Sequence, residues 1–139
     1  MGIGLDLCEI ERLGRAVERP RFMERVFTPR ERERIRAASG ARKAEIAAGT
    51  FAAKEAVAKA LGTGFSDFFT DAVEILPNAD GRPECALTGG AKDRADRLCG
   101  ADRWRVWVSI THDGGMAAAN AILEGFGDPP SPPAPPESR

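Results

Sequence analysis

The part of the chain that says most about its fold is Phe51-Ala-Ala-Lys-Glu-Ala-Val-Ala-Lys-Ala-Leu-Gly-Thr-Gly64. Alanine is the commonest residue over 44–61, which favours a helix and lets that helix pack closely against its neighbours. Gly62 stands where a glycine commonly follows a helix. The stretch therefore predicts a long central helix over 44–61 that runs into a Gly-Thr-Gly loop.

The charged residues of this helix suggest a binding site. The stretch 51–64 carries one carboxylate, Glu55, between two ammonium groups, Lys54 and Lys59. A second carboxylate, Asp6, lies in an apolar N-terminal run, and the single histidine, His112, ends a strand-like segment. Carboxylates suit a hard divalent metal, and lysines and a glycine loop suit phosphate. The combination suggests a site for a phosphorylated ligand.

Each of these residues also has a plainer interpretation. Glu55 precedes Lys59 by four residues, the favourable order for a helical ion pair, and Lys54 could be a solvated side chain. Asp6 could lie on the exposed face of a strand. A lone His112 is most often structural or exposed, although it could bind phosphate or carry a proton. The residues alone leave these alternatives open.

The segments before the central helix predict one strand and then three short helices. Over 3–10 apolar residues alternate with small or polar ones, as in a half-buried strand. Helical patterns follow over 11–19 and, after Pro20, over 21–27. Thr28-Pro29-Arg30-Glu31 reads as a helix start with Thr28 as N-cap, and that helix should end near residue 38.

The segments after the central helix predict an antiparallel sheet. They read as a hairpin over 72–76 and 83–87, a short helix over 91–98, a strand over 103–111 and a strand or helix over 116–123. Asp113 could orient His112, act as a base, or open the turn at Gly114-Gly115, which is the default. The fold class is α+β. Residues 1–124 form one domain, and the proline-rich 125–139 is predicted to be a disordered tail.

Length and composition narrow the classes of protein. A chain of 139 residues supports one domain with a real core, and no apolar stretch approaches the length that spans a membrane. We expect no signal peptide, because no basic segment precedes an apolar one. Three cysteines without metal-ligand spacing are typical of reduced, cytoplasmic thiols.

Charge is unevenly distributed along the chain. The stretch 12–43 carries a net charge of +7 and the remainder −8. It could be a solvated helix face with i,i+3 ion pairs, such as Glu31 with Arg34. It could also be a docking surface for an acidic protein. Nucleic acid is less favoured, because the stretch has few aromatic residues and no binding motif.

Five segments, taken in order, resemble one family, the holo-[acyl-carrier-protein] synthases, which are the small bacterial 4′-phosphopantetheinyl transferases. The resemblance covers about residues 2–124. Its segments are Gly4-Leu-Asp-Leu-Cys-Glu-Ile-Glu-Arg12, Phe27-Thr-Pro-Arg-Glu31, the stretch 51–64, Gly81-Arg-Pro83 and Val108-Ser-Ile-Thr-His112.

The resemblance implies a reaction and a fold. Such enzymes transfer the 4′-phosphopantetheine arm of coenzyme A to a serine of an apo acyl carrier protein and release 3′,5′-ADP. The family fold is an antiparallel sheet packed against a long central helix, assembled as a homotrimer whose active sites are shared between subunits. We therefore expect coenzyme A as substrate, Mg²⁺ as cofactor, an apo acyl carrier protein as partner, and neither nucleic acid nor membrane.

The resemblance also implies roles for individual residues. Asp6 and Glu55 would hold Mg²⁺ against the pyrophosphate, and a metal-bound water, Glu55 or Asp113 would take the serine proton. Lys54, Lys59 and the Gly62-Thr63-Gly64 loop would lie near the phosphates, and Lys59 would also take part in catalysis. Arg42 and Lys43 would bind the 3′-phosphate of coenzyme A. His112 would take part in coenzyme A binding and in catalysis. Arg12, Arg19 and Arg21 would bind the carrier protein.

One departure from the family pattern concerns phosphate binding. Thr50 stands where the family usually has arginine, so one expected phosphate contact is missing. Two other functions compete with transfer: a non-catalytic module that docks carrier proteins, and a coenzyme A-binding regulator without turnover. The intact Asp6, Glu55, Lys59 and His112 favour transfer over both.

Overall fold

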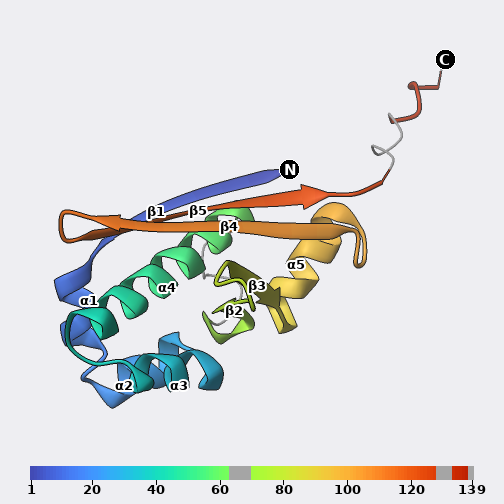
Figure 1. The fold of residues 1–139 in the computed structure, drawn as a ribbon. Helices are drawn as coiled ribbons and strands as arrows, with labels where there is room; N and C mark the ends of the chain where they lie inside the picture. The colour runs from blue at the N-terminus through green and yellow to red at the C-terminus, as the bar shows by residue number, and fades with distance from the viewer. Residues whose placement is uncertain (63–69, 128–132, 138–139) are drawn as a thin grey trace.

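The computed structural model describes residues 1–62, 70–127 and 133–137. Figure 1 shows a sheet lying over a layer of helices and a separate hairpin. In chain order the elements are β1 (Gly2–Glu9), α1 (Ile10–Ala16), α2 (Pro20–Val26), α3 (Pro29–Ala37), α4 (Gly40–Ala60), a 3-10 turn (Thr70–Ala72), β2 (Val73–Pro77), β3 (Pro83–Leu87), α5 (Gly89–Cys99), β4 (Trp104–Asp113) and β5 (Met116–Gly125).

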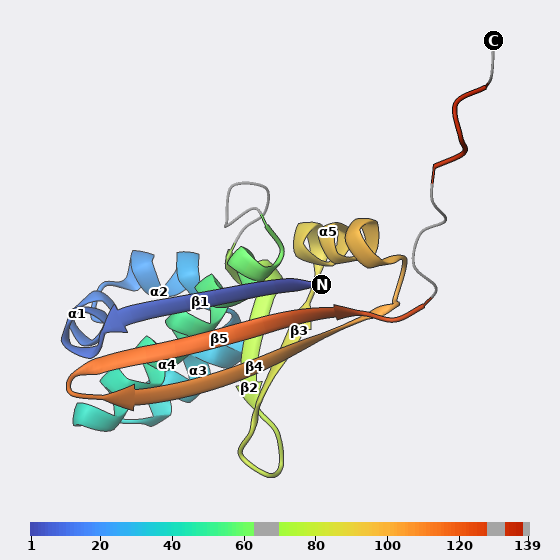
Figure 2. The ribbon, with the colours of Figure 1, turned by 90° about the horizontal axis from the view of Figure 1, so that it is seen from above.

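The main sheet has the strand order β1-β5-β4, and both pairs are antiparallel. β2 and β3 form a second antiparallel pair. Viewed from above in Figure 2, α4 runs under the sheet, whereas α2 and α5 extend beyond the edge formed by β1. The predicted α+β class, with an antiparallel sheet on a long central helix, is therefore confirmed.

Glycines in β1 let the sheet lie directly on the backbone of α4. A Cβ atom added to Gly4 would lie 1.8 Å from the carbonyl oxygen of Ala56, and one added to Gly2 would lie 2.0 Å from that of Ala60. No side chain larger than hydrogen fits at that approach. Because side chains alternate along a strand, Asp6 faces α4 as Gly2 and Gly4 do.

The remaining contacts between sheet and helix also use small residues. Most alanines of α4 are completely buried. They meet the inward face of β5, whose buried residues are Ala117, Ala119, Ala121 and Leu123. The predicted face of β4 also points inward, with Trp104, Val106, Val108 and Ile110 partly buried against the core. Small side chains keep α4 close enough for its charged residues to reach β1.

The outer face of the sheet is apolar and exposed. Ile3, Leu5 and Leu7 of β1 are 73%, 66% and 62% exposed, and Trp107 and Ile122 are exposed beside them. Register places Ile3, Ile122 and Trp107 in one row across three strands. The predicted strand is present, but its buried face is the one with glycines, because α4 can approach only there.

A buried polar network joins α3, α4 and β2. Thr28 caps α3 as predicted, and its backbone N–H and the Glu31 side chain complete a capping box. The interpretation of this stretch as a solvated helix face placed Glu31 in an ion pair with Arg34, and the structure does not show that pair. It is 1% exposed, and its second oxygen accepts a hydrogen bond of 2.8 Å from the N–H of Ile75.

The remaining predictions of elements have clear outcomes. Residues 116–123 belong to a strand, and the central helix starts at Gly40, four residues before its predicted start. Gly62 has a φ of +84° directly after α4, as predicted. None of the described helices is long and apolar enough to cross a membrane. β5 extends to Gly125, and the disordered tail stays a prediction.

Candidate functional site

Asp6, Glu55 and Lys59 meet where β1 crosses the C-terminal half of α4. We call these three residues the carboxylate cluster. The ammonium group of Lys59 donates to the carbonyl oxygen of Leu5 at 2.9 Å and to Asp6 Oδ1 at 3.3 Å. Lys59 thus reaches across to β1, which corrects the interpretation of an ion pair along the helix with Glu55. The Lys59 side chain is 52% exposed, so it still faces solvent.

Partial burial and the nearby charge of Asp6 destabilise the charged form of Glu55. The pKa of Glu55 is raised, first because the side chain is partly buried and then because the charge of Asp6 is close; Lys59 opposes the rise. A divalent cation would relieve this repulsion. The donor set consists of oxygen atoms alone, which suits Mg²⁺.

The cluster offers two carboxylates rather than a complete metal cage. In the described part of the chain, no three His, Cys, Asp or Glu residues gather in a way that could hold a metal ion. Mg²⁺ is commonly bound by one or two carboxylates, with phosphate oxygens and water filling the other positions. The residues present therefore fit a magnesium ion that arrives together with a phosphorylated ligand.

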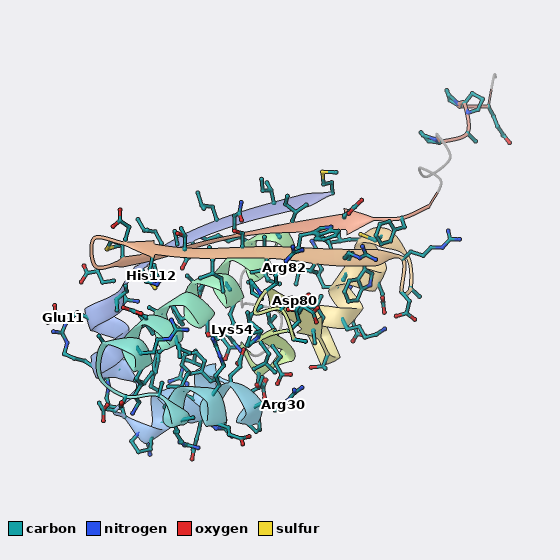
Figure 3. All side chains as sticks on the ribbon, viewed as in Figure 1. Glu11, Arg30, Lys54, Asp80, Arg82 and His112 are labelled. Atoms are coloured by element: carbon teal, nitrogen blue, oxygen red, sulfur yellow. The ribbon has the colours of Figure 1, made fainter. Side chains whose placement is uncertain are left out.

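Lys54 is not part of this cluster, so its predicted position near phosphates is wrong. The side chain is fully buried. Its ammonium group donates to Glu31 Oε1 and to the carbonyl oxygen of Val73, both at 2.6 Å. Figure 3 shows Lys54 among the helices beneath the sheet. Lys54 links α4 to α3 and β2 through these two hydrogen bonds, and its buried ammonium group does not reach the protein surface.

A second group of polar residues lines a groove between α4, the β2–β3 hairpin and β4. We call it the basic groove. Its polar lining is Arg34, Arg42, Glu45, Thr50 and His112, and its other lining residues are Ile46, Gly49, Ile75, Leu76, Pro77, Gly81, Pro83 and Ile110. Gly81 and Pro83 come from one of the segments that resemble the family. Figure 3 shows His112 just under the sheet, near the turn between β4 and β5.

Glu45 lies close to Arg42 and His112, two of the residues that sequence analysis assigned to coenzyme A. Its Oε2 is 3.7 Å from Arg42 and 3.9 Å from His112 Nε2. Lys43 does not join them, because its ammonium group lies 3.6 Å from Glu18, in the turn after α1. The predicted basic pair of Arg42 and Lys43 is therefore divided between two surfaces.

Asp113 does not orient His112. Adjacent residues of a strand point to opposite faces, so Asp113 belongs to the outer face while His112 faces α4. Asp113 is the last residue of β4, and Gly114 and Gly115 follow with φ of +57° and +79°. The default interpretation of Asp113 as the residue that opens the turn fits this geometry.

The carboxylate cluster and the basic groove are separate within one chain. Asp6 is paired through Ala119 to Ile110, two residues before His112. Two strand spacings and two residues place Asp6 and His112 about 12 Å apart. Along α4, Arg42 and Glu55 are separated by about 20 Å. One chain therefore does not bring all the predicted site residues together.

Other predicted residues lie outside these two groups. Arg12, Arg19 and Arg21 are exposed on and between α1 and α2, so a partner protein can reach them. Thr63 and Gly64 lie outside the described residues. Sequence reasoning missed Arg34 and Glu45 as groove residues. The only signal for Arg34 was its place in the basic stretch 12–43, which surface residues share, and Glu45 lies just outside that stretch.

Comparisons with known proteins agree in pointing to one family. The family model of the 4′-phosphopantetheinyl transferase superfamily matches residues 2–111. The holo-[acyl-carrier-protein] synthase of Listeria monocytogenes serotype 4a (strain HCC23) is 48% identical over 126 residues, which covers 88% of this chain and 97% of that protein. That of Clostridium perfringens (strain 13 / Type A) is 42% identical over 127 residues, with coverage of 90% and 94%.

Solved structures of similar fold carry related ligands. A holo-(acyl-carrier-protein) synthase from Bacillus anthracis, in complex with CoA (3′,5′-ADP), has a TM-score of 0.74 and 32% identity, covering 89% of this chain and 96% of that one. The Helicobacter pylori holo-[acyl-carrier-protein] synthase in complex with coenzyme A has a TM-score of 0.73 and 28% identity, covering 88% and 99%. Both matches span nearly all of the described domain.

Proposed function

Because this chain belongs to the 4′-phosphopantetheinyl transferase superfamily, we propose that it transfers the 4′-phosphopantetheine arm of coenzyme A to a serine of an apo acyl carrier protein. The products are the holo carrier protein and 3′,5′-ADP. The observation that carries the proposal is the carboxylate cluster, in which Asp6 and Glu55 are held together beside an exposed Lys59.

Asp6 and Glu55 would hold Mg²⁺ in this proposal. When bound, the metal would offset negative charge that grows on the phosphoryl oxygens during attack by the serine. Lys59 holds Asp6 in place, and its ammonium group has three N–H donors, of which two are used within the chain. The third can donate to a phosphate oxygen.

The basic groove suits the nucleotide part of coenzyme A. Its apolar walls fit the flat adenine ring, and its cations fit a phosphate. Gly49 and Gly81 have no side chain to fill the groove. Arg42 and His112 thus keep the roles that the resemblance implies, whereas Lys54 and Lys43 do not.

We further propose that each active site is shared within a homotrimer. A single chain separates the carboxylate cluster from the basic groove, so a neighbouring subunit is needed to set one chain's groove beside another's cluster. The exposed apolar row of Ile3, Ile122 and Trp107 is the kind of surface that forms subunit contacts. A cyclic trimer uses such a surface three times through heterologous contacts.

Two substitutions test the role of the carboxylate cluster. Asp6→Asn and Glu55→Gln keep side-chain size but remove an anionic metal ligand, so each should abolish transfer while circular dichroism shows an intact fold. Glu11→Gln, which alters an exposed carboxylate on α1, should retain transfer. Near-normal turnover by a folded Asp6→Asn or Glu55→Gln protein would remove the basis of the proposal.

Mixing inactive chains tests the shared site. Glu55→Gln chains supply an intact groove, and Arg42→Gln chains supply an intact carboxylate cluster. After subunit exchange some active sites receive both intact halves, so activity should return in part. A monomer in sedimentation, or no recovery despite demonstrated exchange, would exclude a site shared in this way.

A further inference from the structure

Two guanidinium groups lie in the basic groove, and few negative charges balance their positive charges. Arg34 enters from α3 and Arg42 from the start of α4. Arg42 lies 3.7 Å from Glu45, but none of the ion pairs among the described residues includes Arg34. The pKa of Arg34 is lowered, first by partial burial and then by the nearby charge of Arg42. An anion between them would remove this repulsion.

The family pattern implies two further cations near this phosphate site, one at position 43 and one at position 50, but neither lies in the groove. Lys43 lies against Glu18. Thr50, which stands where the family pattern has arginine, lines the groove with a side chain that is only 3% exposed and carries no charge. In the described residues, the groove's second strong cation is therefore Arg34.

We propose that Arg34 is a substrate-binding residue that holds the 3′-phosphate of coenzyme A together with Arg42. The proposal rests on the function proposed above and assigns the second cation of that site. Guanidinium groups bind phosphate through paired N–H donors, and here two of them come from different helices. Glu45 Oε2 lies 3.7 Å from Arg42 and 3.9 Å from His112 Nε2 in the same groove.

The test compares ligands that differ only in the 3′-phosphate. Binding of 3′,5′-ADP and of 5′-AMP to the protein is measured by calorimetry for the wild type, Arg34→Gln and Arg36→Gln. Arg36 is exposed on the same helix, so its variant is a control for the loss of one positive charge. The fold of each variant is checked by thermal unfolding.

The wild type should bind 3′,5′-ADP more tightly than 5′-AMP. Arg34→Gln should weaken 3′,5′-ADP binding about 10- to 100-fold, the range for a hydrogen bond to a charged group, and should leave 5′-AMP binding nearly unchanged. Arg36→Gln should behave as the wild type. Arg34→Gln should also unfold at or above the wild-type temperature, because it removes the repulsion with Arg42.

Retained preference for 3′,5′-ADP in Arg34→Gln would overturn the assignment of Arg34. If the wild type still transfers the arm to a carrier protein in that case, the proposed function stands and only Arg34 is excluded. A wild type with no preference between the two nucleotides would overturn the assignment as well. Weaker binding of both nucleotides with a lower unfolding temperature would show a structural role instead.

Discussion

Two lysines on one helix should respond oppositely to the same substitution. In Lys54→Met the side-chain volume is nearly kept, but Glu31 loses the cation that lies 2.6 Å away and the carbonyl of Val73 loses a donor. Both charged side chains are at most 1% exposed, so water cannot replace the contact. Breaking one partner of such a pair costs about 3–5 kcal/mol.

That cost is large relative to the stability of a domain. A chain of 139 residues has an unfolding entropy of about 0.3 kcal/mol/K, so the unfolding temperature should fall by about 10–17 °C. In Lys59→Met an ammonium group that is 52% exposed loses its pair with Asp6. An exposed pair contributes at most about 1 kcal/mol, so the shift should stay near 3 °C or less.

The assay measures thermal unfolding and transfer in parallel, at one protein concentration. Below both unfolding temperatures, folded Lys54→Met should retain transfer, whereas Lys59→Met should lose most of it. The double variant Glu31→Gln/Lys54→Met should be more stable than Lys54→Met, because no unpaired charge stays buried. A Lys54→Met protein that unfolds with the wild type but has lost transfer would refute the reasoning.

Three further outcomes follow from the structure. Gly4→Ala should prevent native folding or lower the unfolding temperature severely, since its Cβ would lie 1.8 Å from the backbone of α4, whereas Gly14→Ala meets only a methyl group at 3.0 Å and should be mild. Because the pKa of Glu55 is raised above its ordinary value of 4.5, the unfolded state loses this proton first as pH rises, and ionised Glu55 destabilises the metal-free fold. Glu55→Gln should therefore raise the unfolding temperature near pH 7 but not well below pH 4.5, and Mg²⁺ should stabilise only the wild type. Reversing Arg12 and Arg21 to Glu should slow association with the carrier protein in stopped-flow measurements without changing coenzyme A binding.

Local features of the fold could be predicted from the sequence. The capping box at Thr28, the alternation in β4 and the alanine-rich helix depend on neighbours within a few residues. The face of β1 could not be predicted so simply. Its large side chains suggest the buried face, but Gly2 and Gly4 decide the packing because only they let α4 approach.

The candidate site could be predicted in part, for a similar reason. Asp6, Glu55 and Lys59 belong to sequence motifs that resemble the family, and the fold places the three residues together. Lys54 shares the motif, yet its partner Glu31 lies 23 residues away in sequence. Arg34 has no motif at all, and only the packing of α3 beside α4 and the hairpin brings it to the groove.

The most direct test of the proposed transfer is the intact mass of an apo acyl carrier protein after incubation with this protein, coenzyme A and Mg²⁺. We predict that the carrier gains the mass of one 4′-phosphopantetheine arm, that 3′,5′-ADP appears in equal amount, and that both stop when the metal is chelated. A carrier that co-elutes with the protein but keeps its mass would contradict transfer and indicate docking alone. Coenzyme A bound without turnover would contradict it as well and indicate a regulator.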